Sequence, residues 1–113
     1  MPKQSPNLDR VFYALADPTR RAVLARLSAG PAAVTQLAEP FDMALPSFSQ
    51  HLKVLENCGL IRSRKEGRVR TVELAPKPLQ AAENWMVEQR GMWERRLDQL
   101  DAFVLQMKKE QKR

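Results

Sequence analysis

Apolar side chains recur every three or four positions in several stretches of the chain, which is the spacing of amphipathic helices. In the first stretch this spacing is kept by Leu8, Val11, Phe12 and Leu15. One face of the predicted helix is therefore apolar and needs another surface to cover it.

The second stretch carries clear signals for where a helix begins and ends. Asp17 can cap the helix, Pro18 fits its first turn, and Gly30 follows its end. The apolar positions of this helix leave Arg20 on the polar side. We therefore expect Arg20 to be solvated, as we do the two other arginines of the helix.

The third pattern consists of two helices separated by a brief turn. A short helical stretch capped by Thr35 precedes a longer helix that starts near Leu45 and stops at Gly59. Over about residues 35–58 this layout predicts a helix-turn-helix, whose second helix lies in the major groove of DNA. The apolar face of the second helix is expected to consist of Phe48, Leu52 and Leu55.

The same spacing directs small polar and basic side chains outward from this second helix. They are Ser47, Ser49, Gln50 and Lys53. Serine and glutamine can bond to base edges, glutamine can pair with adenine through two bonds, and lysine can reach guanine or a phosphate. We predict that these four residues bind DNA, although serine is also favoured in the first turn of a helix for structural reasons.

A basic hairpin is predicted directly after this helix, over about residues 60–75. Both halves are strand-like, and Gly67 supplies the tight turn between them. Residues 60–72 carry five basic residues against Glu66 alone. We predict that Arg64, Arg68 and Arg70 bind phosphates as a wing, and an ordinary charged surface remains the alternative.

The last stretch predicts a long helix over about residues 78–107, too apolar to be covered by so small a body. We expect it to pair with a second copy of the chain, together with the first helix. The predicted dimerisation residues are Leu8, Phe12, Trp85, Trp93, Leu97, Leu100 and Val104. The two tryptophans could instead line a ligand pocket.

Composition narrows the class of protein further. The chain has 113 residues, the size of one domain, so we assign residues 1–113 to a single winged-helix domain. The formal net charge of +6 indicates a polyanionic partner, and no apolar run is long enough to span a membrane. The lone Cys58 fits a reducing compartment, and we predict a cytoplasmic protein without a membrane partner.

Three segments resemble the ArsR family of bacterial winged-helix repressors. They are ALADPTRRAVLARLSAG, SFSQHLKVLENCGLI and RSRKEGRVRTVEL, and the resemblance covers roughly residues 7–104. It implies a mainly α-helical fold with a small β-hairpin wing, a homodimer, and repression at an imperfect palindrome in double-stranded DNA. An inducer of unidentified chemistry is also implied. Within the family pattern, Ser47, Ser49, Gln50 and Lys53 fall on the recognition helix, and Arg64, Arg68 and Arg70 fall on the wing.

The chain departs from the members of that family that sense metals. VTQLAEPF has no cysteine, and the last helix has acidic residues but no histidine. His51 and Cys58 are single soft ligands, whereas a tight transition-metal site needs three or four. We predict no metal site and no cofactor, with His51 either a packing residue or a DNA contact, and Cys58 either an inert thiol or a redox switch.

Other function classes are weaker. The sequence has no glycine-rich phosphate loop and no nucleophile with a base and an orienting group, so we predict no enzymatic activity. A winged-helix module that pairs with another protein and does not read DNA remains the alternative function.

Overall fold

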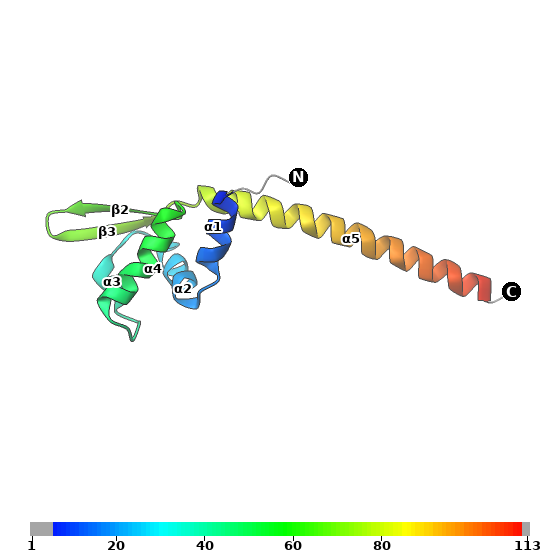
Figure 1. The fold of residues 1–113 in the computed structure, drawn as a ribbon, viewed down its shortest axis with the longest axis horizontal. Helices are drawn as coiled ribbons and strands as arrows, with labels where there is room; N and C mark the ends of the chain where they lie inside the picture. Colours follow the sequence, from blue (N-terminus) through cyan, green and yellow to red (C-terminus); the bar gives the residue numbers. More distant parts are fainter. Residues whose placement is uncertain (1–5, 112–113) are drawn as a thin grey trace. The chain divides into compact units, whose positions relative to one another are not determined.

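The computed structural model describes residues 6–111, which form five helices and a small three-stranded sheet (Figure 1). The elements are α1 (Pro6–Leu15), α2 (Pro18–Leu27), β1 (Ala32–Ala33), α3 (Val34–Ala38), α4 (Leu45–Asn57), β2 (Ile61–Glu66), β3 (Val69–Leu74) and α5 (Lys77–Gln111). This order confirms the predicted winged helix-turn-helix fold. The chain divides into two compact units, one ending at Ala82 and the other starting at Glu83.

The core of the first unit is built from all four of its short helices and the sheet. Phe48, Leu52 and Leu55 of α4 are buried, as their spacing predicts. In α1, Val11 and Ala14 are the fully buried side chains, and the other apolar residues of the stripe pack against the core while still partly exposed. The α4 helix is therefore held by one face, and its other face remains on the surface.

The sheet contains a third strand that the sequence does not reveal. β1 pairs antiparallel with β3, with Ala32 opposite Val72 and Ala33 opposite Thr71, so the strand order is β1-β3-β2. Two alanines are too short a segment to show the alternation of a strand. The strand forms because β3 offers an unpaired edge, and Ala32 is buried there.

Gly59 ends α4 and starts the wing within two residues. Its φ of +79° is left-handed, and its N–H donates to the carbonyl of Glu56 at 2.9 Å while Leu60 N–H donates to Leu55 at 3.0 Å. These two bonds form a Schellman motif, which favours glycine. A side chain at this position would also meet Pro78 Cγ at 3.3 Å.

The wing is a two-stranded hairpin with a two-residue turn. Its register runs from Ile61 opposite Leu74 to Glu66 opposite Val69. Gly67 has a φ of +62°, as a tight turn of this kind requires. Figure 1 shows this hairpin extending beside α3 and α4.

Arg20 is buried, so the prediction that it is solvated is wrong. Only 7% of the residue is exposed. Its Nε donates to the carbonyl of Ala14 at 2.8 Å and its Nη2 to that of Tyr13 at 2.9 Å. These carbonyls lie at the end of α1, where a helix leaves acceptors without partners. Arg20 supplies a donor to the carbonyl of Ala14 and a second donor to that of Tyr13, which also accepts from Ala16 N–H at 3.2 Å.

The same arginine reaches the recognition helix. Arg20 Nη1 lies 3.1 Å from Nδ1 of His51, which lies in turn 3.7 Å from Asp17 Oδ2. A guanidinium can only donate, so in this contact Nδ1 of His51 is the acceptor. His51 thus serves a structural contact between α2 and α4.

Asp17 caps α2 as predicted, because its Oδ2 accepts from Arg20 N–H at 3.1 Å. Partial burial acts to raise the pKa of this carboxyl, but the Arg20 hydrogen bond and neighbouring positive charge outweigh it and hold the pKa below its usual value. The cap is therefore ionised at neutral pH.

The second unit is the remainder of α5, a single helix with an exposed apolar stripe. Side chains that fall within this stripe at 3.6 residues per turn include Trp85, Trp93, Leu97, Leu100 and Val104. Trp93 is 68% exposed and Leu97 59%. Over residues 6–111 no helix has an apolar segment long enough to cross a bilayer.

We expect Arg20→Met to lower the free energy of unfolding by about 2–4 kcal/mol, because the carbonyls of Ala14 and Tyr13 lose their hydrogen bonds from Arg20 and the bond to Ala14 is buried. Urea denaturation at one protein concentration measures this. Arg26→Met, which changes an exposed arginine of the same helix, is the control and should cost under about 0.5 kcal/mol. Equal losses in the two variants would show that the Arg20 contacts add nothing to stability.

Candidate nucleic-acid interface

The outer face of α4 carries the side chains that the sequence assigns to DNA binding. Ser47, Ser49, Gln50 and Lys53 are all exposed. The opposite face is anchored in the core through Phe48 and its neighbours, so the polar row has a fixed support. All four side chains can therefore reach a ligand outside the protein.

Two further residues of α4 belong to the same surface and were missed. Glu56 and Asn57 are exposed and border the same groove as Gln50 and Lys53. Asn57 lies seven residues after Gln50 and four after Lys53, so helical spacing alone could have identified it. Asparagine, like glutamine, can pair with adenine through two bonds.

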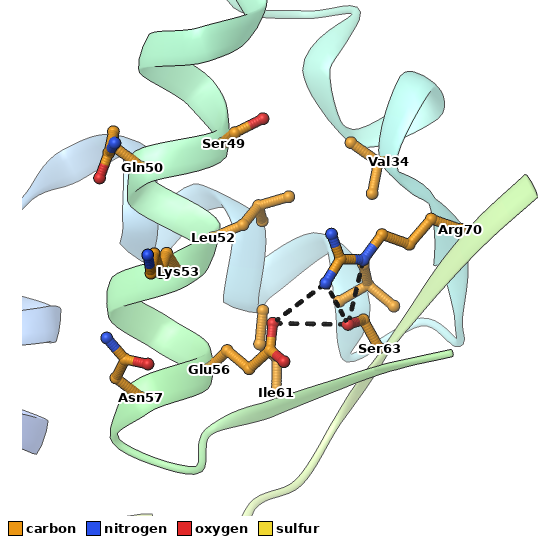
Figure 2. Close-up of a pocket in the computed structure, with 11 residues that line it drawn as sticks. Val34, Ser49, Gln50, Leu52, Lys53, Glu56, Asn57, Ile61, Ser63 and Arg70 are labelled. Atoms are coloured by element: carbon orange, nitrogen blue, oxygen red, sulfur yellow. Dashed lines mark hydrogen bonds and ion pairs between the residues drawn. The ribbon is translucent and has the colours of Figure 1, made fainter. Parts of the chain in front are cut away.

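A groove of about 500 Å³ separates α4 from the wing. Figure 2 shows Gln50, Lys53 and Asn57 along one side of α4, with Glu56 directed toward the wing. The walls of the groove come from α3, α4 and both wing strands. The residues that line the groove are Val34, Ser49, Gln50, Leu52, Lys53, Glu56, Asn57, Ile61, Ser63, Arg70 and Val72. Residues of the polar row and of the wing therefore line the same groove.

The three predicted wing arginines have different surroundings. Arg64 lies on β2 with its Nε 3.2 Å from Glu66 Oε1, and Arg68 is exposed in the turn. Arg70 points into the groove, where its Nη2 lies 3.7 Å from Glu56 Oε2 of α4. The structure therefore joins Arg70 to the recognition helix, while Arg64 and Arg68 are placed toward the tip of the hairpin.

His51 and Cys58 lie off the polar row. The His51 side chain is 23% exposed and is held by Arg20, which favours the packing role over the DNA contact. Cys58 is buried, its Sγ donates to Leu55 O at 3.3 Å, and desolvation raises the pKa of its thiol. Both properties favour an inert thiol.

The described part of the chain gathers no three histidine, cysteine, aspartate or glutamate side chains into a group that could hold a metal ion. Its acidic side chains are instead spread along the surface, several of them paired with arginines. The chemistry available at the groove is hydrogen bonding and charge.

Comparison with known sequences gives consistent matches. A family model described as a helix-turn-helix domain matches residues 15–64. The chain is 47% identical over 73 residues to the HTH-type transcriptional regulator Rv2034 of Mycobacterium tuberculosis, covering 65% of this chain and 68% of that protein. It is 35% identical over 80 residues to the transcriptional repressor SdpR of Bacillus subtilis, covering 71% and 89%.

Solved structures agree with these sequences. The crystal structure of the ArsR family transcriptional regulator RHA00566 has 55% identity and a TM-score of 0.78, covering 83% of this chain and 97% of that chain. The solution structure of Mb0332 from Mycobacterium bovis, a homodimeric winged helix-turn-helix DNA-binding domain, has 26% identity and a TM-score of 0.60, covering 84% and 95%.

We expect the Cys58 thiol of the folded protein to react with a thiol reagent such as Ellman's reagent at least about a hundredfold more slowly than in urea, because it is buried and protonated. The absorbance of the released thiolate measures both rates. Rapid reaction of the folded protein, at the rate of a free thiol, would restore the redox switch as a hypothesis.

Proposed function

The chain belongs to the ArsR family of winged-helix transcriptional regulators, and from this membership we propose that it is a homodimeric repressor of a palindromic promoter site. It is a DNA-binding regulator and not an enzyme, as its sequence predicted. The observation that carries the proposal is the exposed polar row of α4 beside the basic wing.

In the proposed complex, α4 enters the major groove of DNA. Ser47, Ser49, Gln50 and Lys53 would face the base edges, since they are the outward residues of the first three turns of the helix. The N-terminal residues of a recognition helix are the ones that reach bases in this class of protein. This arrangement would assign sequence preference to α4.

The wing would bind the neighbouring phosphates. Arg64, Arg68 and Arg70 lie on β2, on the turn and on β3 respectively, and all three are exposed. Each phosphate neutralised by such a side chain releases counterions and adds affinity that does not depend on sequence. This arrangement would assign general affinity to the wing.

The second copy of the chain would cover the apolar stripe of α5. A stripe that includes Trp85, Trp93, Leu97, Leu100 and Val104 is too apolar to remain in water, since large exposed apolar patches mark interaction sites. We propose that Leu8 and Phe12 of α1 also contact the second copy of the chain. The homodimer described for Mb0332 supports this assembly, whose two-fold symmetry would space the DNA half-sites by about 34 Å.

The direction of regulation is proposed from a relative, and a further partner from the family resemblance. SdpR is described as a repressor, which supports repression here. An inducer that changes the affinity for DNA would be the further partner, and its chemistry is not metal coordination by the motifs of the metal-sensing members. We place the protein in the cytoplasm, where its DNA and a reduced Cys58 would both be found.

We expect Gln50→Ala to weaken operator binding by about 1–3 kcal/mol and to relax preference at one base pair. Gel-shift titration with a duplex selected from a randomised library measures the affinity, and repeated selection measures the preference. Gln106→Ala, which removes an exposed amide from α5, is the control and should change neither.

We expect Arg68→Ala to weaken binding to all duplexes alike and to make the salt dependence shallower by about one ion. Titrations at several salt concentrations measure the slope, with Arg26→Ala as a control. If Arg68→Ala altered sequence preference while Gln50→Ala did not, the proposed roles of wing and helix would be reversed. If the protein selected no duplex, the module without DNA recognition would replace the repressor.

We expect Leu100→Glu to raise the dimer dissociation constant by roughly two orders of magnitude, because each copy would bury a charge. Sedimentation equilibrium measures this constant. Leu105→Glu is a matched control, since Leu105 is similarly exposed but lies outside the stripe, about 140° around α5 from Leu100 at 100° per residue. Equal effects of the two substitutions would exclude the stripe as the interface.

A further inference from the structure

The recognition helix carries one carboxylate, Glu56, and this carboxylate is joined to the wing. Arg70 donates from Nε and Nη2 to Ser63 Oγ at 3.2 and 3.1 Å. Ser63 Oγ donates to Glu56 Oε2 at 3.4 Å, and Arg70 Nη2 lies 3.7 Å from the same oxygen. Figure 2 shows that these three side chains link α4, β2 and β3 across the groove.

The position of Glu56 calls for a physical reason. A carboxylate beside a groove that receives phosphates repels them and weakens binding. The acidic residues of the wing pair with arginines of the wing itself. Glu73 lies 3.8 Å from Arg62, and Glu66 lies 3.2 Å from Arg64. Glu56 is different because it lies on the recognition helix, whereas its partner Arg70 lies on the wing.

The link does not use all the N–H donors of the Arg70 guanidinium. Its contacts with Ser63 and Glu56 use Nε and Nη2. A guanidinium has five N–H donors, so the hydrogens on Nη1 can still meet a phosphate. Arg70 can therefore hold the recognition helix and bind DNA at the same time.

We propose that Glu56 is a positioning residue for sequence discrimination, because through Ser63 and Arg70 it holds the wing at a fixed angle to the recognition helix. The proposal rests on the function proposed above, in which that helix and wing bind DNA. Phosphate contacts set the register in which a helix meets base edges. A wing held by Glu56 forms its phosphate contacts where the base contacts also form, whereas a loose wing forms them on any sequence.

The test compares E56Q with E73Q, which removes the same charge from an ion pair within the wing and leaves the link to α4 intact. The probes are a duplex selected from a randomised library by the wild-type protein and a scrambled duplex of equal length. Both variants should bind the scrambled duplex more tightly, since each loses a negative charge. The dissociation constant for the scrambled duplex divided by that for the selected duplex measures discrimination. This ratio should fall about fivefold or more in E56Q alone.

Two further variants separate the link from the charge. S63A removes the hydrogen bonds that join Ser63 to Glu56 and Arg70 without changing the net charge, so the ratio should fall in the same direction as in E56Q while the salt slope stays unchanged. In an R70A background E56Q should not lower the ratio further, because the link is already lost. Equal ratios in E56Q and E73Q, or the full effect of E56Q in the R70A background, would overturn the proposal.

Side-chain ¹H–¹⁵N spectra of the free protein detect the link without DNA. The Arg70 Nε–H signal, identified as the one lost in R70K, should shift in E56Q and stay in place in E73Q. An unmoved signal in E56Q overturns the link itself. A wild-type protein that does not prefer its selected duplex overturns the proposed function, and with it the role of Glu56 in discrimination, even where the Arg70 signal shifts.

Discussion

The arrangement of α1, α2 and α4 depends on the hydrogen bonds of the Arg20 guanidinium. Its donors satisfy the carbonyls of Tyr13 and Ala14 at the end of α1 and meet His51 in the middle of α4. A buried charge is costly unless it is hydrogen-bonded, and Arg20 forms these bonds only while α1, α2 and α4 keep their positions. The recognition helix is thereby fixed from its buried side.

The second constraint is the abrupt end of α4. Gly59 turns the chain in a left-handed conformation, and Leu60 and Ile61 enter the core immediately afterwards. No flexible linker separates the helix from the wing, so the two DNA-facing elements share one rigid attachment. The groove between them, and the link from Glu56 to Arg70 across it, exist because of this short connection.

These constraints separate the tasks of the molecule among its parts. The polar row of α4 is short, rigid and close to neutral, which suits contacts with base edges. Positive charge is concentrated on the hairpin, where it can act on phosphates without specifying sequence. The apolar stripe of α5 suits neither base recognition nor phosphate binding. Its exposed tryptophans and leucines suit self-association.

The sequence alone determined the features that depend on local periodicity and turn chemistry. Helical spacing in α4 gave both the buried Phe48, Leu52 and Leu55 and the exposed row opposite them, since one period decides both faces. Gly59 predicted the end of α4 and Gly67 predicted the tip of the wing, because both positions need a positive φ.

Only the tertiary structure decided the features whose partners lie far apart in the chain. Arg20 is buried because it meets α1 and a histidine 31 residues away, and β1 forms because β3 offers an edge. The direction of Arg70 depends likewise on Glu56 in another element. Such pairings leave no periodic trace, because the residues involved are ordinary charged or small residues until folding brings them together.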